Sequence, residues 1–135
     1  MVGIDTNVLI RYIVQDDAGQ AALAQELIEK GCSPQDPASI PLIVLCESVW
    51  VLSITYGYSR GQVASVLRQI LLTESFDVEA HAMAWNALYD YQADRADYAD
   101  CLIARLNQER GCRTTFTFDR KAARLSGFTL LAGVH

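Results

Sequence analysis

Short apolar runs alternate with longer segments of helical period along the whole chain, and this alternation restricts the fold more than any other feature. Strands that alternate with helices favour a layered α/β domain with a mainly parallel sheet and right-handed crossovers. The runs expected to form strands are Val2–Ile4, Ile40–Ile43, Phe76–Val78, Thr114–Phe118 and Phe128–Leu131.

The segments between these runs carry apolar residues three or four positions apart, which indicates amphipathic helices. Ser59 and Gln62 resemble a capping box and should start one of them, and Gly31 should end another. The expected helices are one that opens at 5–7, Ala18–Lys30, about Leu45–Tyr56, one after Ser59, one around 80–91, one around 99–106 and a short one at Asp119–Leu125.

The bulk composition fits one globular domain that spans residues 1–135. Of the 135 residues, 51% are apolar and 20% are charged, which excludes a disordered chain. None of the four cysteines forms a C-x-x-C pair, and we expect a cytosolic protein with no signal peptide and no membrane span. The net charge of −5 argues against a nucleic-acid partner unless metal ions or a basic patch neutralise the phosphates.

Glu47 is the acid whose surroundings most need an explanation. It is the only charged residue between Asp36 and Arg60, and apolar residues flank it on both sides in the expected helix. A carboxylate in such a setting is rarely buried without a partner, because an unpaired buried charge is costly. The alternative is an exposed glutamate near a helix start.

Asp5 and Asp119 each stand where an expected strand gives way to a helix. The carboxyl ends of parallel strands are where sites form in α/β sheets, so the two acids are candidate site residues. Asn7 and Thr117 add oxygen-bearing side chains beside them. Each acid could instead be an ordinary helix N-cap, since aspartate is among the best capping residues.

Asp97 and Asp100 lie three positions apart at the start of an expected helix and are therefore neighbours on its surface. On a helical wheel Asp100 falls on the shoulder of an apolar stripe made by Ala99, Leu102, Ile103 and Leu106, whereas Asp97 falls roughly opposite the stripe. We therefore rank Asp100 first as a ligand. Asp97 is either an outer helper or a partner of the helix dipole.

Together these are four carboxylates, Asp5, Glu47, Asp100 and Asp119, from segments far apart in the sequence. Converging carboxylates repel each other and are tolerated when a cation compensates them. Neither cysteine nor histidine stands at these positions, so the ligand set is all oxygen and favours Mg²⁺ or Mn²⁺. Such a site serves phosphodiester hydrolysis, with one or two metal ions.

The combined motifs resemble the PIN domain, and more narrowly the VapC-type toxins of bacterial toxin–antitoxin pairs. The resemblance rests on Asp5–Leu9, Glu47, Asp97–Ala104 and Thr117–Asp119, and it covers nearly the whole chain in order and spacing. Together the motifs are specific, although each alone would be common.

The resemblance implies a three-layer α/β/α sandwich around a central, mainly parallel sheet. It also implies an Mg²⁺- or Mn²⁺-dependent endoribonuclease that forms homodimers and is kept inactive by an antitoxin protein. The positions that match the family's four acids are Asp5, Glu47, Asp100 and Asp119; Asp97 matches an acid present in only some members, and Asn7 and Thr117 match polar residues beside the ligands.

Basic side chains are candidates for contacts with RNA phosphates, or form an ordinary solvated surface. They are Arg11 and six residues of the last third of the chain, Arg105, Arg110, Arg113, Arg120, Lys121 and Arg124. His81 is expected to be structural. Two other functions stay open: a non-catalytic binding module, and a phosphatase of the haloacid-dehalogenase type, against which Asn7 speaks because it stands where that family has a second aspartate.

Overall fold

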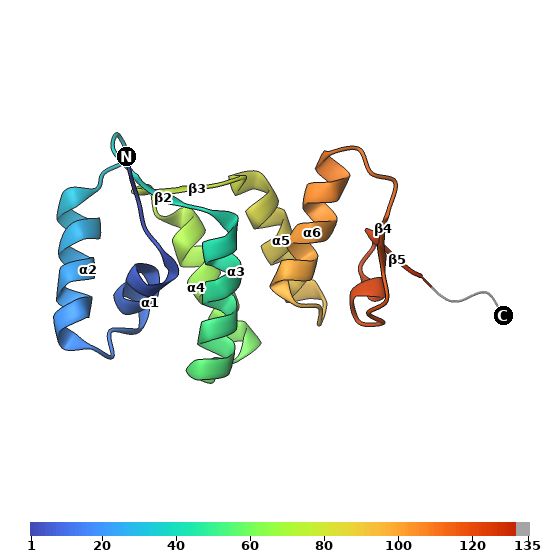
Figure 1. Cartoon of the computed structure of the whole chain (residues 1–135), viewed down its shortest axis with the longest axis horizontal. Coiled ribbons are helices and arrows are strands. Elements are labelled where there is room, and N and C mark those ends of the chain that lie inside the picture. Colours follow the sequence, from blue (N-terminus) through green and yellow to red (C-terminus); the bar gives the residue numbers. More distant parts are fainter. Residues whose placement is uncertain (132–135) are drawn as a thin grey trace. The chain divides into compact units, whose positions relative to one another are not determined.

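The computed structural model describes residues 1–131, so the last four residues of the expected 1–135 domain lie outside it. The chain forms two compact units, Met1–His81 and Ala82–His135. Figure 1 shows the order of the helices and strands along the chain.

The first unit holds a three-stranded parallel sheet in the order β1-β2-β3. The central strand β2 pairs with both neighbours, and its Ala38 lies opposite Val2 on one side and Phe76 on the other. The elements are β1 (Val2–Gly3), α1 (Thr6–Val14), α2 (Ala18–Gly31), β2 (Ala38–Ile40), α3 (Leu42–Trp50), the π-helix η1 (Val51–Thr55), α4 (Arg60–Leu72) and β3 (Phe76–Val78).

Local sequence signals set the ends of these helices. The expected capping box is confirmed at α4, where the Ser59 hydroxyl accepts a hydrogen bond from the Gln62 backbone N–H and the Gln62 side chain accepts one from the Ser59 N–H. The helices bury their apolar faces in a core that contains Leu9, Leu45 and Leu67, each at most 1% exposed. The strand expected at Phe76–Val78 is confirmed as β3.

The prediction of a strand at Ile40–Ile43 is wrong, because β2 ends at Ile40 and α3 begins at Leu42. Pro41 lies between them as the N-cap of α3, with φ −64°. Proline has no N–H to give to a sheet, and its fixed φ suits the entry to a helix. The helix expected from about Leu45 therefore starts three residues earlier, and from Val51 it continues as a π-helical turn.

As far as the structure describes it, the second unit combines two α-helices and a 3-10 helix with a short pair of parallel strands. Its elements are α5 (His81–Ala93), which begins at the last residue of the first unit, α6 (Tyr98–Glu109), β4 (Thr115–Thr117), the 3-10 helix η2 (Ala122–Arg124) and β5 (Phe128–Leu130). Thr115 of β4 lies opposite Phe128 of β5. The facing sides of α5 and α6 are apolar and buried. Their buried residues include Ala84 and Leu88 of α5 and Tyr98, Cys101 and Leu102 of α6.

The chain is a mixed α/β protein, as the sequence predicts, and each pairing between named strands in residues 1–131 is parallel. In the part of the chain that the structure describes, the strands form two sheets, one in each unit, of three and two strands. Within residues 1–131 none of the four cysteines forms a disulfide bond. Within the described residues, no helix combines the length and the apolar character needed to cross a bilayer.

Candidate active site

Asp5 begins the first helix of the first unit and uses one carboxylate oxygen to do so. Its backbone is extended, with φ −95° and ψ −179°, and its Oδ1 accepts a hydrogen bond from the Val8 N–H at 3.0 Å. The helix-cap interpretation of Asp5 is therefore confirmed. Within residues 1–131 its other oxygen, Oδ2, makes no hydrogen bond or ion pair, so it remains free for a cation.

Glu47 lies on the exposed side of α3, and its carboxylate is tied to the start of α1. The Thr6 hydroxyl donates a hydrogen bond to Glu47 Oε1 at 3.1 Å. The apolar neighbours that suggested an enclosed carboxylate mostly face elsewhere: Val44 and Leu45 are buried, whereas Glu47 is exposed. The exposed alternative is the correct one, so burial does not explain Glu47.

Asn7 lies one residue further along α1 and is exposed. Together with Asp5 it lines a mainly apolar hollow of about 320 Å³ between α1 and α2. The first unit thus places Asp5 and Asn7 at the start of α1, with the Thr6 side chain reaching from there to Glu47.

In the second unit Asp100 lies within reach of the negative charges of Asp97 and Asp119. Asp100 lies in the first turn of α6 and is half-buried, whereas Asp97 is the backbone N-cap of that helix, is exposed, and makes no side-chain cap hydrogen bond. Burial, and then the negative charges of Asp97 and Asp119, raise the pKa of the Asp100 carboxyl above its ordinary value. A positive charge beside Asp100 would relieve this strain.

The prediction of the apolar stripe on α6 is wrong at two positions. Ala99 is exposed and Ile103 is 44% exposed, while Tyr98 and Cys101 are buried instead. The buried face of α6 is therefore displaced by about one residue from the face that the helical wheel predicts. The ranking of Asp100 before Asp97 now rests on their difference in burial.

Asp119 follows β4 and anchors the turn behind it. Its Oδ1 accepts hydrogen bonds from the backbone N–H groups of Lys121, at 2.8 Å, and Ala122, at 3.4 Å. Its own N–H donates to the Thr117 hydroxyl at 3.0 Å, so Thr117 fixes the backbone that carries the acid. The short helix expected at Asp119–Leu125 shrinks to the 3-10 helix at Ala122–Arg124.

The chemistry of these acids fits a hard divalent cation. The candidate ligands offer only carboxylate oxygens, which Mg²⁺ and Mn²⁺ prefer. Asp5, Glu47 and Asp119 each commit one oxygen to a hydrogen bond, and in residues 1–131 the second oxygen of each has no such bond. In neither unit do the described residues bring three His, Cys, Asp or Glu side chains close enough to hold one ion.

Sequence reasoning passed over Thr6, the residue that contacts Glu47. Its signal was available, because Thr6 is a polar residue between Asp5 and Asn7. The histidine assessment fits the structure: His81 Nε2 is 2.9 Å from the backbone oxygen of Leu71, a structural contact.

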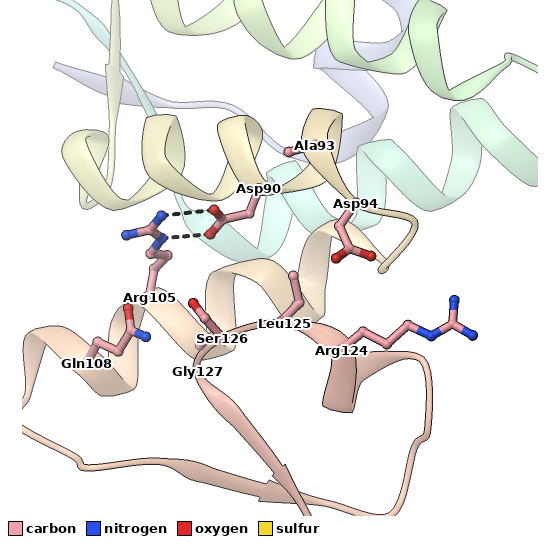
Figure 2. Close-up of a pocket in the computed structure, with 10 residues that line it drawn as sticks. Asp90, Ala93, Asp94, Arg105, Gln108, Arg124, Leu125, Ser126 and Gly127 are labelled. Carbon is pink, nitrogen blue, oxygen red and sulfur yellow. Dashed lines mark hydrogen bonds and ion pairs between the residues drawn. The ribbon is translucent and has the colours of Figure 1, made fainter.

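Two of the basic residues considered for RNA contacts are engaged within the protein. Arg11 bonds Asp16 at 3.0 Å, Gln20 and Tyr56. Arg105 forms a two-pronged ion pair with Asp90, at 2.6 and 2.8 Å, beside a hollow of about 180 Å³ between α5, α6 and the turn at 124–127 (Figure 2). Five others are exposed: Arg110, Arg113, Arg120, Lys121 and Arg124.

The Asp90–Arg105 pair should stabilise the second unit measurably, because it joins α5 to α6 and the two side chains are only 21% and 33% exposed. Bonding to Asp90 also raises the pKa of Arg105. We expect Asp90→Asn to lower the free energy of unfolding by about 1–2 kcal/mol, between the values for surface and buried pairs. Urea titrations of Asp90→Asn, Arg105→Gln and the double variant measure the coupling. Additive effects of the two single changes would show that the pair contributes nothing.

The fold and the candidate site define a class: an α/β protein with parallel strands whose acids stand at strand ends and helix starts. Comparison with known proteins identifies the family. A model of the PIN domain family matches residues 2–127, and the chain belongs to this family. It is also 26% identical over 125 residues to a VapC ribonuclease of Aquifex aeolicus (strain VF5), across 90% of each chain.

Proposed function

We propose that this protein is a divalent-metal-dependent endoribonuclease that acts as the toxin of a toxin–antitoxin pair. The observation that carries the proposal is the match to the PIN domain family over residues 2–127. It is supported by the motif resemblance, which assigns the family's four acid positions to Asp5, Glu47, Asp100 and Asp119. The similarity to a protein named VapC ribonuclease supports RNA as the substrate.

In this proposal Asp5, Glu47, Asp100 and Asp119 hold Mg²⁺ or Mn²⁺. The bound cation would supply activation of a water molecule and stabilisation of negative charge on the scissile phosphate. The chain's own contribution is to fix the positions of the acid side chains by hydrogen bonds. Asp5 and Asp119 are fixed through one oxygen each, and Thr117 fixes the backbone at Asp119.

Asp97 and Asn7 have supporting roles in this proposal. Asp97 adds negative charge beside Asp100. Its carboxylate makes no hydrogen bond to the first turn of α6 and is therefore not restrained as a helix cap. Asn7 offers a neutral amide at the start of α1, next to Asp5, where it can bind a phosphate oxygen or a water molecule. Neither role requires proton transfer.

We assign contacts with RNA phosphates to the exposed basic residues of the second unit, Arg110, Arg113, Arg120, Lys121 and Arg124. Arg11 and Arg105 are less suitable, because each is already paired with an aspartate. We further propose that the whole chain acts as one domain in the cytoplasm, as a homodimer, and that an antitoxin protein inhibits it.

The proposal is tested with purified protein, a mixture of structured RNAs and millimolar Mn²⁺. Wild-type protein should cleave RNA and EDTA should stop it, while Asp5→Asn should reduce cleavage by about 100-fold or more. Asp77→Asn is the matched control, because Asp77 is an exposed acid on the edge strand β3, outside the candidate site. It should cleave like the wild type.

Three results would overturn the proposal. Cleavage that is equal in Asp5→Asn and wild type would remove the acids from the reaction. Saturable Mn²⁺ binding with no cleavage of any RNA would favour a binding module. Trapping of a phosphorylated Asp5 would favour a phosphatase.

A further inference from the structure

A hydrogen bond between side chains joins the first helix to the third beside the proposed metal site. The Thr6 hydroxyl donates to Glu47 Oε1 at 3.1 Å, across 41 positions of sequence. In the described residues this is the sole hydrogen bond of the Glu47 carboxylate, and Oε2 has no partner. Thr6 is thus the one group in residues 1–131 that restrains the Glu47 side chain by a polar contact.

The Thr6 hydroxyl is free for this task because a neighbour caps the helix. Hydroxyl residues at a helix start commonly bond the helix's own first N–H groups. Here Asp5 is the N-cap and its Oδ1 accepts from Val8. Thr6 is also half-buried and branched at Cβ, so few rotamers are open to it. The Thr6 hydroxyl is therefore a hydrogen-bond donor with few accessible orientations, and it faces Glu47 of α3.

The two helices are tied together separately at the other end of α1. Arg11 Nη1 donates to the Tyr56 hydroxyl at 3.1 Å, and the same hydroxyl donates to Asp16 at 2.9 Å. Tyr56 directly follows η1, which continues α3. Because this second contact holds the helices in place, loss of the Thr6 bond should free the Glu47 side chain without moving α3.

We propose that Thr6 is a positioning residue for Glu47. Its hydroxyl holds Oε1 so that the carboxylate stays beside the start of α1, next to Asp5, and Oε2 remains available to a divalent cation. An exposed glutamate otherwise samples many rotamers, and the cation would have to order it on binding. The inference rests on the proposed function, since it gives Glu47 a cation to bind.

The experiment measures Mn²⁺ affinity by calorimetry, and kcat and KM for RNA cleavage, in Thr6→Val and Thr6→Ser. Valine keeps the shape of threonine and removes the donor, while serine keeps the donor. We expect Thr6→Val to weaken Mn²⁺ binding by about 10-fold and to lower kcat with little change in KM. Thr6→Ser should recover binding to within about 3-fold of wild type.

Thr55→Val is the matched control, since Thr55 is exposed at the end of η1 and lies outside the site. It should bind Mn²⁺ like the wild type. The melting temperature of metal-free Thr6→Val should stay within about 3 °C of wild type, because the bond is partly exposed. A larger drop would point to a structural role and overturn the proposal.

Glu47→Gln separates failure of this inference from failure of the proposed function. If Glu47→Gln loses Mn²⁺ affinity but Thr6→Val does not, Thr6 is no positioning residue and the proposed function stands. If Glu47→Gln binds and cleaves like the wild type, the proposed role of Glu47 fails. In support of the proposal, Thr6→Val combined with Glu47→Gln should be no worse than Glu47→Gln alone.

Discussion

Asp100→Asn should reduce RNA cleavage by about 1,000-fold and at the same time make the metal-free protein more stable. The two effects share one cause. Burial and the charges of Asp97 and Asp119 raise the pKa of Asp100, so its ionised form is held in an unfavourable place. Asparagine keeps the shape and removes the charge. It therefore removes the repulsion and, on the proposed function, a ligand of the cation.

The direction of the pH dependence follows from the raised pKa. At a pH above the raised pKa, Asp100 is ionised in both the folded and the unfolded protein. Only the folded protein then carries the cost of burial and of repulsion by Asp97 and Asp119. As the pH falls through the raised pKa towards the ordinary value of 3.8, the folded state takes up the proton first and the penalty disappears. The gain in melting temperature of Asp100→Asn should thus be about 2–4 °C at pH 7 and shrink on acidification.

Calorimetric melting of both proteins in EDTA, from pH 7 down to pH 4, measures this difference. Asp77→Asn is again the control, because Asp77 is exposed and should show no such gain. Addition of Mn²⁺ should reverse the order, since ligand binding stabilises only the protein that keeps its site. A metal-free Asp100→Asn protein that melts below wild type would contradict the account of Asp100.

The sequence singles out the candidate acids, but it does not predict which contact each carboxylate makes. For Asp5 and Asp119 it left two interpretations, helix cap or site residue. The structure confirms the cap for Asp5, whereas at Asp119 the N-cap of η2 is Lys121 and the Asp119 carboxylate bonds the turn before that helix. Neither finding removes the site interpretation. A carboxylate has two oxygens. In residues 1–131, Oδ1 of each aspartate accepts from backbone N–H groups, while Oδ2 has no hydrogen-bond partner. Because both tasks need aspartate at the same position, sequence alone could not separate them.

Glu47 was the acid with the strongest argument from sequence, and that argument was wrong in its premise. Apolar neighbours suggested an enclosed carboxylate, yet Ile43 and Trp50 on the same helix are 67% and 62% exposed. The sequence cannot say which apolar residues face outward when nearly all positions of a helix are apolar. The contact that does restrain Glu47 comes from Thr6, 41 positions away, and such a pairing leaves no periodic signal.

The elements themselves were predicted where a local signal is strong. Ser59 starts α4, and Phe76–Val78 is a strand, because a capping box and a short β-branched and aromatic run act within a few residues. Prediction failed at Ile40–Ile43, where apolar side chains continue from a strand into a helix. Pro41 marks the change, and its missing N–H is the physical reason.

Tyr98→Ala should be among the most destabilising single changes in the second unit. The Tyr98 side chain is 1% exposed, its hydroxyl donates to the Ala84 backbone oxygen at 2.8 Å, and its ring meets that of Tyr91 edge-on. Removal leaves a large cavity and should cost about 3–5 kcal/mol. Tyr98→Phe loses the hydrogen bond alone and should cost about 1 kcal/mol.

The effect should reach the candidate site because Tyr98 lies between Asp97 and Asp100 and fixes the first turn of α6 against α5. Hydrogen exchange in the segment 98–109 should quicken strongly in Tyr98→Ala, and Mn²⁺ affinity should fall with it. Tyr98→Phe should keep both near wild type. Tyr89→Ala is the control, since Tyr89 is on α5 but 70% exposed. If Tyr98→Ala exchanged no faster than Tyr89→Ala, Tyr98 would not be what holds the start of α6.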